Sequence, residues 1–127
     1  MKLTPVCPEG IYPTGGDYLH AVEVSRFERL VHVAGTMGLA PDGTPGDSLD
    51  RQLQLIWSNI RTILAAADMT IDHVVRVTSY LTDRAQVQAN QDARLKALGG
   101  RAVPTTAIVV TTLSDDWLVE IEVIAAA

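Results

Sequence analysis

The chain has 127 residues, of which 47% are hydrophobic and 20% charged, a composition typical of one globular domain spanning residues 1–127. The net charge of −5 and the pI of about 5.0 speak against a nucleic acid partner, because binding to phosphates needs clustered cations. No apolar run approaches the roughly 20 residues of a membrane span, and Met1–Pro5 lacks a signal-peptide core. Cys7 is the only cysteine, which agrees with a reducing compartment. We therefore expect a cytoplasmic protein without a membrane partner.

The first third of the chain predicts an irregular opening followed by two strands. Val6–Asp17 contains two prolines and three glycines and is expected to form a loop. Tyr18–Val24 and Leu30–Ala34 alternate like strands, and the polar turn between them predicts a β-hairpin. Gly35–Gly46 carries four glycines, so its backbone amides can approach a ligand closely, although it matches no known phosphate-binding motif.

The clearest predicted element is a helix that begins at Asp47 or Ser48. Its apolar residues recur at three- and four-residue steps up to Ala67, as one buried face requires. Gln52 and Asn59 lie seven residues apart on nearly one side of this helix, where we expect them to bond to loops.

The middle of the chain predicts a strand and then a second helix. Ile71–Leu81 is rich in β-branched residues that alternate with polar ones. Asp83 is a suitable N-cap for a helix through Leu98, and Gly99-Gly100 provides a glycine stop.

The C-terminal end predicts two further strands, Val103–Leu113 and Trp117–Ala125, which we expect to form a second β-hairpin. In the last strand one face is wholly apolar, whereas the other carries Glu120 and Glu122 between apolar neighbours. Because a partly desolvated carboxylate needs a partner, Glu120 is the first candidate for chemistry. The alternative is that both glutamates lie on a solvated face of the sheet.

The order of the elements predicts an α+β fold: a two-layer sandwich in which two helices cover one face of a mixed sheet. The predicted strands have apolar residues on both faces. The face that the helices leave open therefore needs another cover, and we expect a homo-oligomer.

The standard catalytic constellations do not appear in the sequence. His20, His32 and His73 lack metal-site spacing, so we expect no metal and no cofactor. No serine lies in a Gly-x-Ser-x-Gly elbow.

Several segments together resemble the RidA proteins, the YjgF/YER057c/UK114 family of reactive-intermediate deaminases. The segments that carry the resemblance are Gly16–Tyr18, Val33–Gly38, Gln52 with Asn59-Ile60, Asn90, and Val119–Ala125. The resemblance implies a chorismate-mutase-like fold and a homotrimer with small-molecule pockets at its subunit interfaces. It also implies hydrolysis of imines and enamines to keto acids and ammonia.

The resemblance assigns site residues and shows one departure. Tyr18, Gly35, Asn90 and Glu120 match the family pattern, with Glu120 as the implied acid/base. The arginine that binds the substrate carboxylate in active members is missing here, because either possible register places a threonine, Thr105 or Thr106, at its position.

Three other positions bear on this departure. Ala34 and Thr36 stand where the family has a small polar residue and a glutamine, and Arg101 is a candidate to replace the missing cation. A threonine hydroxyl cannot reproduce the paired bonds of an arginine to a carboxylate. The resemblance therefore implies an enzyme acting on a non-standard imine, enamine or related carbonyl compound. The alternative is a non-catalytic ligand-binding trimer, and a ribonuclease fits the acidic charge poorly.

Overall fold

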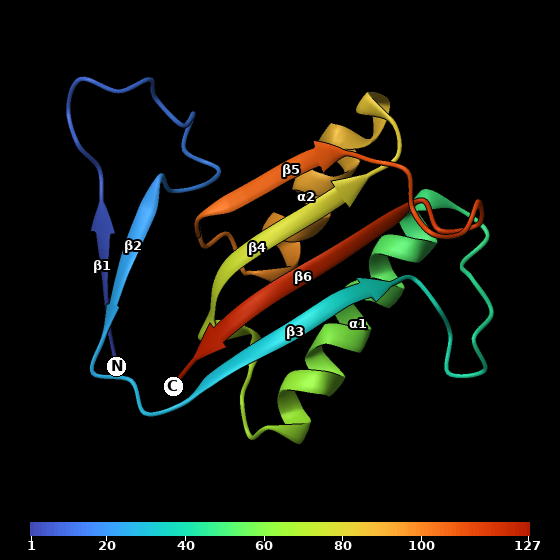
Figure 1. Ribbon diagram of the computed structural model, residues 1–127, viewed down its shortest axis with the longest axis horizontal. Helices are drawn as coiled ribbons and strands as arrows, with labels where there is room; N and C mark the ends of the chain where they lie inside the picture. Colours follow the sequence, from blue (N-terminus) through green and yellow to red (C-terminus); the bar gives the residue numbers. More distant parts are fainter.

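The computed structural model describes all of residues 1–127 and contains six strands and two α-helices (Figure 1). The strands are β1 (Lys2–Val6), β2 (Ala21–Ser25), β3 (Leu30–Met37), β4 (Val74–Leu81), β5 (Thr105–Val109) and β6 (Val119–Ala126). The helices are α1 (Leu49–Ala66) and α2 (Val87–Ala97), and short 3₁₀ turns at Ile71–His73 and Arg84–Gln86 precede β4 and α2.

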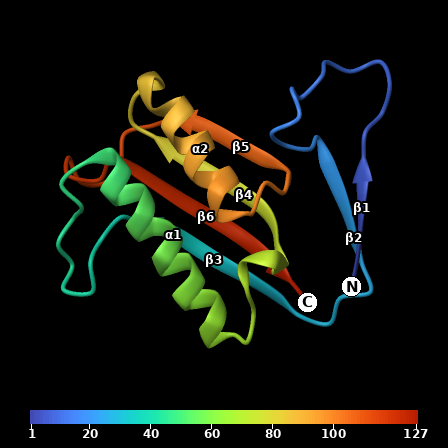
Figure 2. The same ribbon diagram turned by 180° about the vertical axis from the view of Figure 1, so that it is seen from behind.

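Four strands form the main sheet, in the order β3-β6-β4-β5. β6 is antiparallel to both of its neighbours, whereas β5 runs parallel to β4. Both helices lie on one face of this sheet, as Figure 2 shows from behind. The fold is thus the predicted two-layer α+β sandwich with a mixed sheet.

The first helix begins and ends close to the predicted positions. Ser48 is the N-cap, and its hydroxyl accepts a bond from the Arg51 N–H at 3.1 Å. The buried face includes Ile56, Ile60 and Leu64, each fully buried against the inner face of the sheet. Burial of such side chains contributes roughly 1.5–3 kcal/mol each, so this face anchors the helical layer.

Gln52 and Asn59 of α1 both bond to loops, as predicted. The Gln52 side-chain amide donates to the carbonyls of Gly46 and Asp116, both at 2.9 Å, and its oxygen accepts from the Leu118 N–H at 2.9 Å. The Asn59 amide donates to the carbonyl of Leu39 at 3.0 Å. These bonds fix the two loops that lead into and out of the sheet.

The predicted C-terminal hairpin is wrong, because β5 and β6 do not pair with each other. β4 lies between them, and the connection from β5 to β6 passes the end of β4. The inner face of β6 explains its central position: Val119, Ile121, Val123 and Ala125 are at most 2% exposed. A strand this apolar gains most when it is covered by neighbours on both edges and by both helices.

The predicted N-terminal hairpin is also wrong. β2 pairs with β1, a strand that the sequence pattern did not reveal, and not with β3. The Glu28 and Arg29 N–H groups both bond to the carbonyl of Ala127, at 2.8 and 2.9 Å. The chain between β2 and β3 is therefore held against the end of β6 and does not form a tight reversal.

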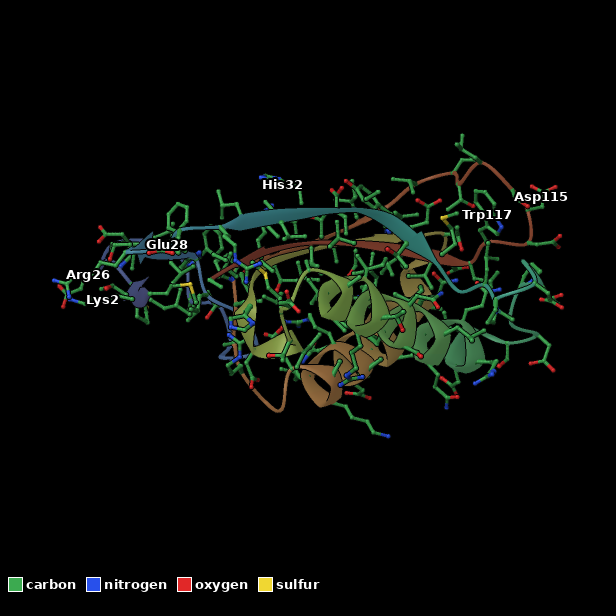
Figure 3. The ribbon with its side chains drawn as sticks, turned by 90° about the horizontal axis from the view of Figure 1, so that it is seen from below. Lys2, Arg26, Glu28, His32, Asp115 and Trp117 are labelled. Carbon is green, nitrogen blue, oxygen red and sulfur yellow. The ribbon has the colours of Figure 1, made fainter.

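The second face of the main sheet is left open by the helices, as predicted. Figure 3 views the sheet edge-on, with both helices on one side and His32 pointing away from them on the other. Arg76 of β4 and Ile108 of β5 are exposed, and Glu120 of β6 is partly exposed. No helix of the chain is long and apolar enough to cross a membrane.

Candidate functional site

Three of the predicted site residues line one cavity at the β5 edge of the sheet. Tyr18, Asn90 and Thr105 contribute to it from the N-terminal segment, from α2 and from the start of β5. The cavity has a volume of about 460 Å³. The Asn90 side-chain oxygen is buried without a hydrogen-bond partner in the chain, so it is an acceptor that a ligand or water can satisfy.

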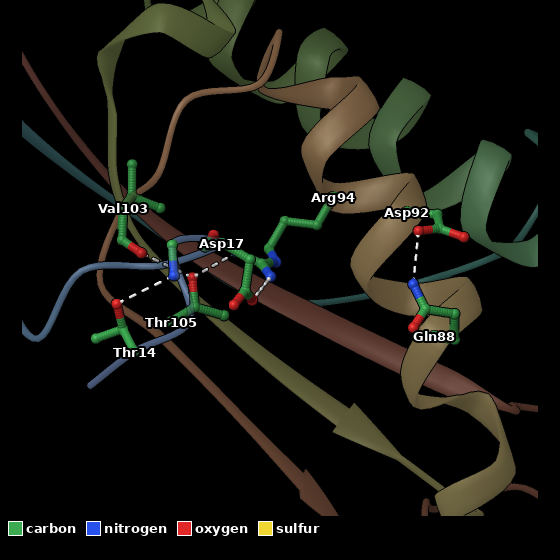
Figure 4. Close-up of polar contacts among 8 residues, drawn as sticks. Thr14, Asp17, Gln88, Asp92, Arg94, Val103 and Thr105 are labelled. Atoms are coloured by element: carbon green, nitrogen blue, oxygen red, sulfur yellow. Dashed lines mark hydrogen bonds and ion pairs between the residues drawn. The ribbon is translucent and has the colours of Figure 1, made fainter. Parts of the chain in front are cut away.

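A buried ion pair forms one wall of this cavity (Figure 4). Arg94 of α2 is only 3% exposed, and its Nη2 lies 2.8 Å from Asp17 Oδ2. Its Nη1 donates to the Asp17 carbonyl at 2.8 Å and to the Thr105 hydroxyl oxygen at 3.2 Å. Asp17 balances the charge of Arg94, so this arginine ties the N-terminal segment to α2 and β5.

The Thr105 hydroxyl is engaged within the chain. It donates to the Val103 carbonyl at 3.0 Å while it accepts from Arg94. Both its proton and a lone pair are therefore used, and a bound anion would have to displace one of these bonds. Thr105 contributes shape to the cavity rather than a free polar group.

A second arginine lies at the open mouth of the cavity. Arg76 of β4 donates from its Nη2 to the Thr106 hydroxyl at 3.0 Å. The Arg94–Asp17 pair is the only ion pair in the chain, so Arg76 has no carboxylate partner. Arg76 also lines a smaller hollow that includes Glu122. It is the cation that this part of the sheet presents to solvent.

Arg101 does not reach the cavity. Its Nη2 donates to the carbonyls of Ile71 and Val74, at 3.0 and 3.1 Å, and it is not among the lining residues. Within one chain Arg101 is therefore not placed to replace the missing arginine, and its role stays a prediction. Arg101 fixes the entrance of β4, and the cations near Thr105 are Arg94 and Arg76.

Glu120 lies beside Gly35, away from the Tyr18 cavity, and Thr36 follows Gly35 in β3. On the open face of β6, Glu120 is registered opposite Met37 of β3. A Cβ atom added to Gly35 would come within 2.8 Å of Glu120 Oε2, so the carboxylate lies against the bare backbone of this glycine. Gly35 and Thr36 line a shallow surface hollow that shares no residue with the Tyr18 cavity.

The neighbouring Glu122 has a phenol partner. The Tyr80 hydroxyl donates to Glu122 Oε1 from the adjacent strand. This hydrogen bond raises the pKa of Tyr80, and desolvation and the charge of Glu122 act in the same direction. Alternation along the predicted strand Ile71–Leu81 puts Arg76 and Tyr80 on one face. This pattern was the sequence signal for the polar cluster. Arg94 gave no such signal, because an arginine inside a helix is normally exposed.

The fold and these two groups of polar residues define a small α+β protein with ligand-sized hollows on its sheet. A protein family described as Endoribonuclease L-PSP matches residues 12–127. The chain belongs to this family, which is the RidA/YjgF family that its motifs resemble.

Individual relatives agree with this assignment. The RutC family protein YjgH of Escherichia coli is 32% identical over 83 residues, which cover 65% of this chain and 63% of that protein. The RutC family protein PH0854 of Pyrococcus horikoshii is 30% identical over 113 residues, or 87% of this chain and 86% of that protein. The crystal structure of the Rid family protein YyfB from Yersinia pestis matches over the whole of both chains, with a TM-score of 0.85 at 27% identity.

Proposed function

We propose that the protein is a RidA-like enzyme that hydrolyses the C=N bond of a small imine, including an imine that forms by tautomerisation of an enamine. The observation that carries this proposal is the contact between the Glu120 carboxylate and the backbone of Gly35. Because Gly35 has no side chain, a small ligand can approach its backbone next to Glu120, which is a potential acid/base. Both residues belong to motifs that the chain has in common with the RidA pattern.

The proposed reaction needs one water and one proton carrier. Glu120 accepts a proton from a water molecule as the water oxygen adds to the carbon of the protonated imine, giving a neutral carbinolamine. The protonated Glu120 then gives its proton to the nitrogen, and its carboxylate takes up the hydroxyl proton as the C–N bond breaks, the C=O bond forms and ammonia leaves. The Gly35 backbone amide faces the developing oxygen charge. No cofactor or metal takes part in this scheme.

The ligand would bind between subunits of a homotrimer. Tyr18, Asn90 and Thr105 line one hollow, while Gly35 lies at another and contacts Glu120. A second copy of the chain can bring these two halves together, and the open sheet face supplies the surface for that contact. Three copies close such a head-to-tail arrangement, as the family resemblance implies.

The substrate would differ from a simple 2-imino acid bound by an arginine at position 105. Thr105 is bonded to Val103 and Arg94, so an anionic group of the substrate would bind at Arg76 instead. The anion would then lie over Thr106 at the mouth of the cavity. We further propose a reducing compartment such as the cytoplasm, where the exposed thiol of Cys7 stays reduced.

Steady-state assays against a panel of enzymatically generated imines, followed by release of ammonia, test this function. We expect turnover on at least one imine and its loss in Glu120→Gln. The missing arginine favours a second candidate, a non-catalytic binding trimer. That candidate would be supported if carbonyl ligands bind but no imine is hydrolysed faster than in buffer.

A further inference from the structure

The β1–β2 hairpin, which we call the arm, stands apart from the main sheet (Figures 1 and 2). All five residues of β1 are exposed, and neither strand pairs with the main sheet. The register of the arm places Leu3 opposite Val24 and Pro5 opposite Val22, so these four residues share one apolar face. A two-stranded hairpin is marginally stable in water, and this face therefore needs a cover.

The main sheet has a free edge of its own. β3 is an edge strand that pairs only with β6, and β2 pairs only with β1. Each chain thus presents free edges on β2 and β3, in addition to those of β1 and β5, and the backbone groups along these edges lack a partner strand. Such edges readily accept another strand.

The chain's own bonds keep its β2 away from its own β3. The Asp17–Arg94 ion pair and the bond from the Leu19 N–H to the Val103 carbonyl (3.3 Å) hold the root of β2 beside β5. β5 and β3 form opposite edges of the main sheet. Pairing of β2 with its own β3 would draw the root of β2 away from β5, where the Asp17–Arg94 ion pair holds it.

Residues 26–29 form the connection between β2 and β3. Arg26 has a φ of 56°, which turns the chain away from a regular strand. Arg29 donates from its Nη1 to the carbonyl of Ala67 at 2.7 Å, which fixes the beginning of β3 to the body of the molecule. β2 is therefore held to the body of the molecule on both sides, through Asp17 and Leu19 before it and through Arg29 after it.

We propose that the arm is exchanged between copies of this chain: β2 pairs antiparallel with β3 of a second copy. The hydrophobic pattern selects the register. Val22 opposite Val33 of the partner subunit and Val24 opposite Val31 of the partner subunit extend the apolar, helix-facing layer. Glu23 then lies opposite His32 of the partner subunit on the open face. A slip by one residue would place Glu23 among apolar side chains.

The exchange completes the proposed site, and its chemical meaning rests on the proposed function. Antiparallel pairing brings the start of β2, which follows Tyr18, to the end of the β3 with which it pairs. Gly35 and Glu120 lie at that end of β3. Tyr18, with Asn90 of its own chain, thereby meets Glu120 of the partner subunit.

Disulfide trapping tests the exchange without any substrate. A size-tagged Cys7→Ser/Glu23→Cys chain is co-expressed with an untagged Cys7→Ser/His32→Cys chain, and the purified mixture is oxidised. Both replaced side chains are exposed, and directly opposed positions of antiparallel strands are close enough for a disulfide. We expect a linked tagged–untagged dimer on a non-reducing denaturing gel. Each single-cysteine chain, oxidised alone, is the control for random linkage.

The opposite results are equally clear. If only a Glu23→Cys/His32→Cys double variant forms a disulfide, and does so within one chain at unchanged mass, the arm folds onto its own β3. If neither preparation links, β2 does not lie on β3 at all, and the exchange is overturned. If the chains link but hydrolyse no imine, the proposed function is wrong and the exchange holds. If the chains hydrolyse an imine but do not link, the exchange is wrong and the proposed function holds.

Discussion

Glu120 and Glu122 share one face of β6 but have different neighbours. Glu120 rests against the backbone of Gly35, whereas Glu122 accepts the Tyr80 hydroxyl. Sequence alternation placed both glutamates on this face. It could not separate their surroundings, because Gly35 and Tyr80 come from other strands.

Replacing Glu120 by glutamine tests its role as the acid/base. The amide keeps the shape of the side chain but removes the titratable proton, so we expect turnover to fall by roughly 10²–10⁴-fold with little change in ligand affinity. Glu9→Gln, in an exposed loop, is the matched charge control. Equal activity of the two variants would make Glu120 a structural residue.

Tyr80 gives the open face a dependence on alkaline pH. Its pKa is raised, chiefly by the bond to Glu122, so the neutral phenol stabilises the folded state fully below its ordinary pKa of about 10. This contribution disappears as the pH rises through the higher folded value. We expect wild type to lose more stability than Tyr80→Phe in that alkaline range, measured by urea unfolding across pH. Parallel pH curves would contradict this assignment.

Arg76 is the residue on which anion binding is expected to depend. A charged hydrogen bond contributes roughly 1.5–3 kcal/mol, so Arg76→Gln should weaken binding of a small carboxylate such as pyruvate by about 10- to 100-fold. Isothermal calorimetry measures this change. Arg51→Gln, which removes an exposed arginine from the helical layer, should leave the affinity unchanged.

At the scale of elements, the sequence predicts what each segment is better than what it pairs with. Apolar periodicity and the cap at Ser48 were sufficient for α1, whereas Asp83 caps the 3₁₀ turn at Arg84–Gln86 that leads into α2. Both predicted hairpins were wrong, because pairing depends on distant strands. β4 lies between β5 and β6, and contacts of Arg29 and Ala127 replace the turn between β2 and β3.

Gln52 shows how one polar side chain can hold two loops together. It is 2% exposed and makes three hydrogen bonds, so Gln52→Ala should lower the free energy of unfolding by roughly 2–4 kcal/mol. Chemical denaturation at one fixed protein concentration measures the loss. Gln54→Ala, at an exposed position two residues further along α1, should change stability by less than about 0.5 kcal/mol.

At the scale of the whole molecule, the proposed trimer covers the open sheet face, and the proposed exchange pairs the free edge of β3. We expect light scattering to give about three times the chain mass of 13.7 kDa at micromolar concentration. A stable monomer would contradict both the proposed trimer and the exchanged arm.

The central position of β6 also has a consequence for how the protein is made. β3 has no other partner in the sheet, and β4 has only β5, yet β6 follows all three along the chain. During synthesis one edge of β3 and one edge of β4 must therefore wait, unpaired, until residues 119–126 have left the ribosome. The sheet cannot close before then, and a message truncated just before β6 would yield a chain that chaperones and proteases recognise as unfinished.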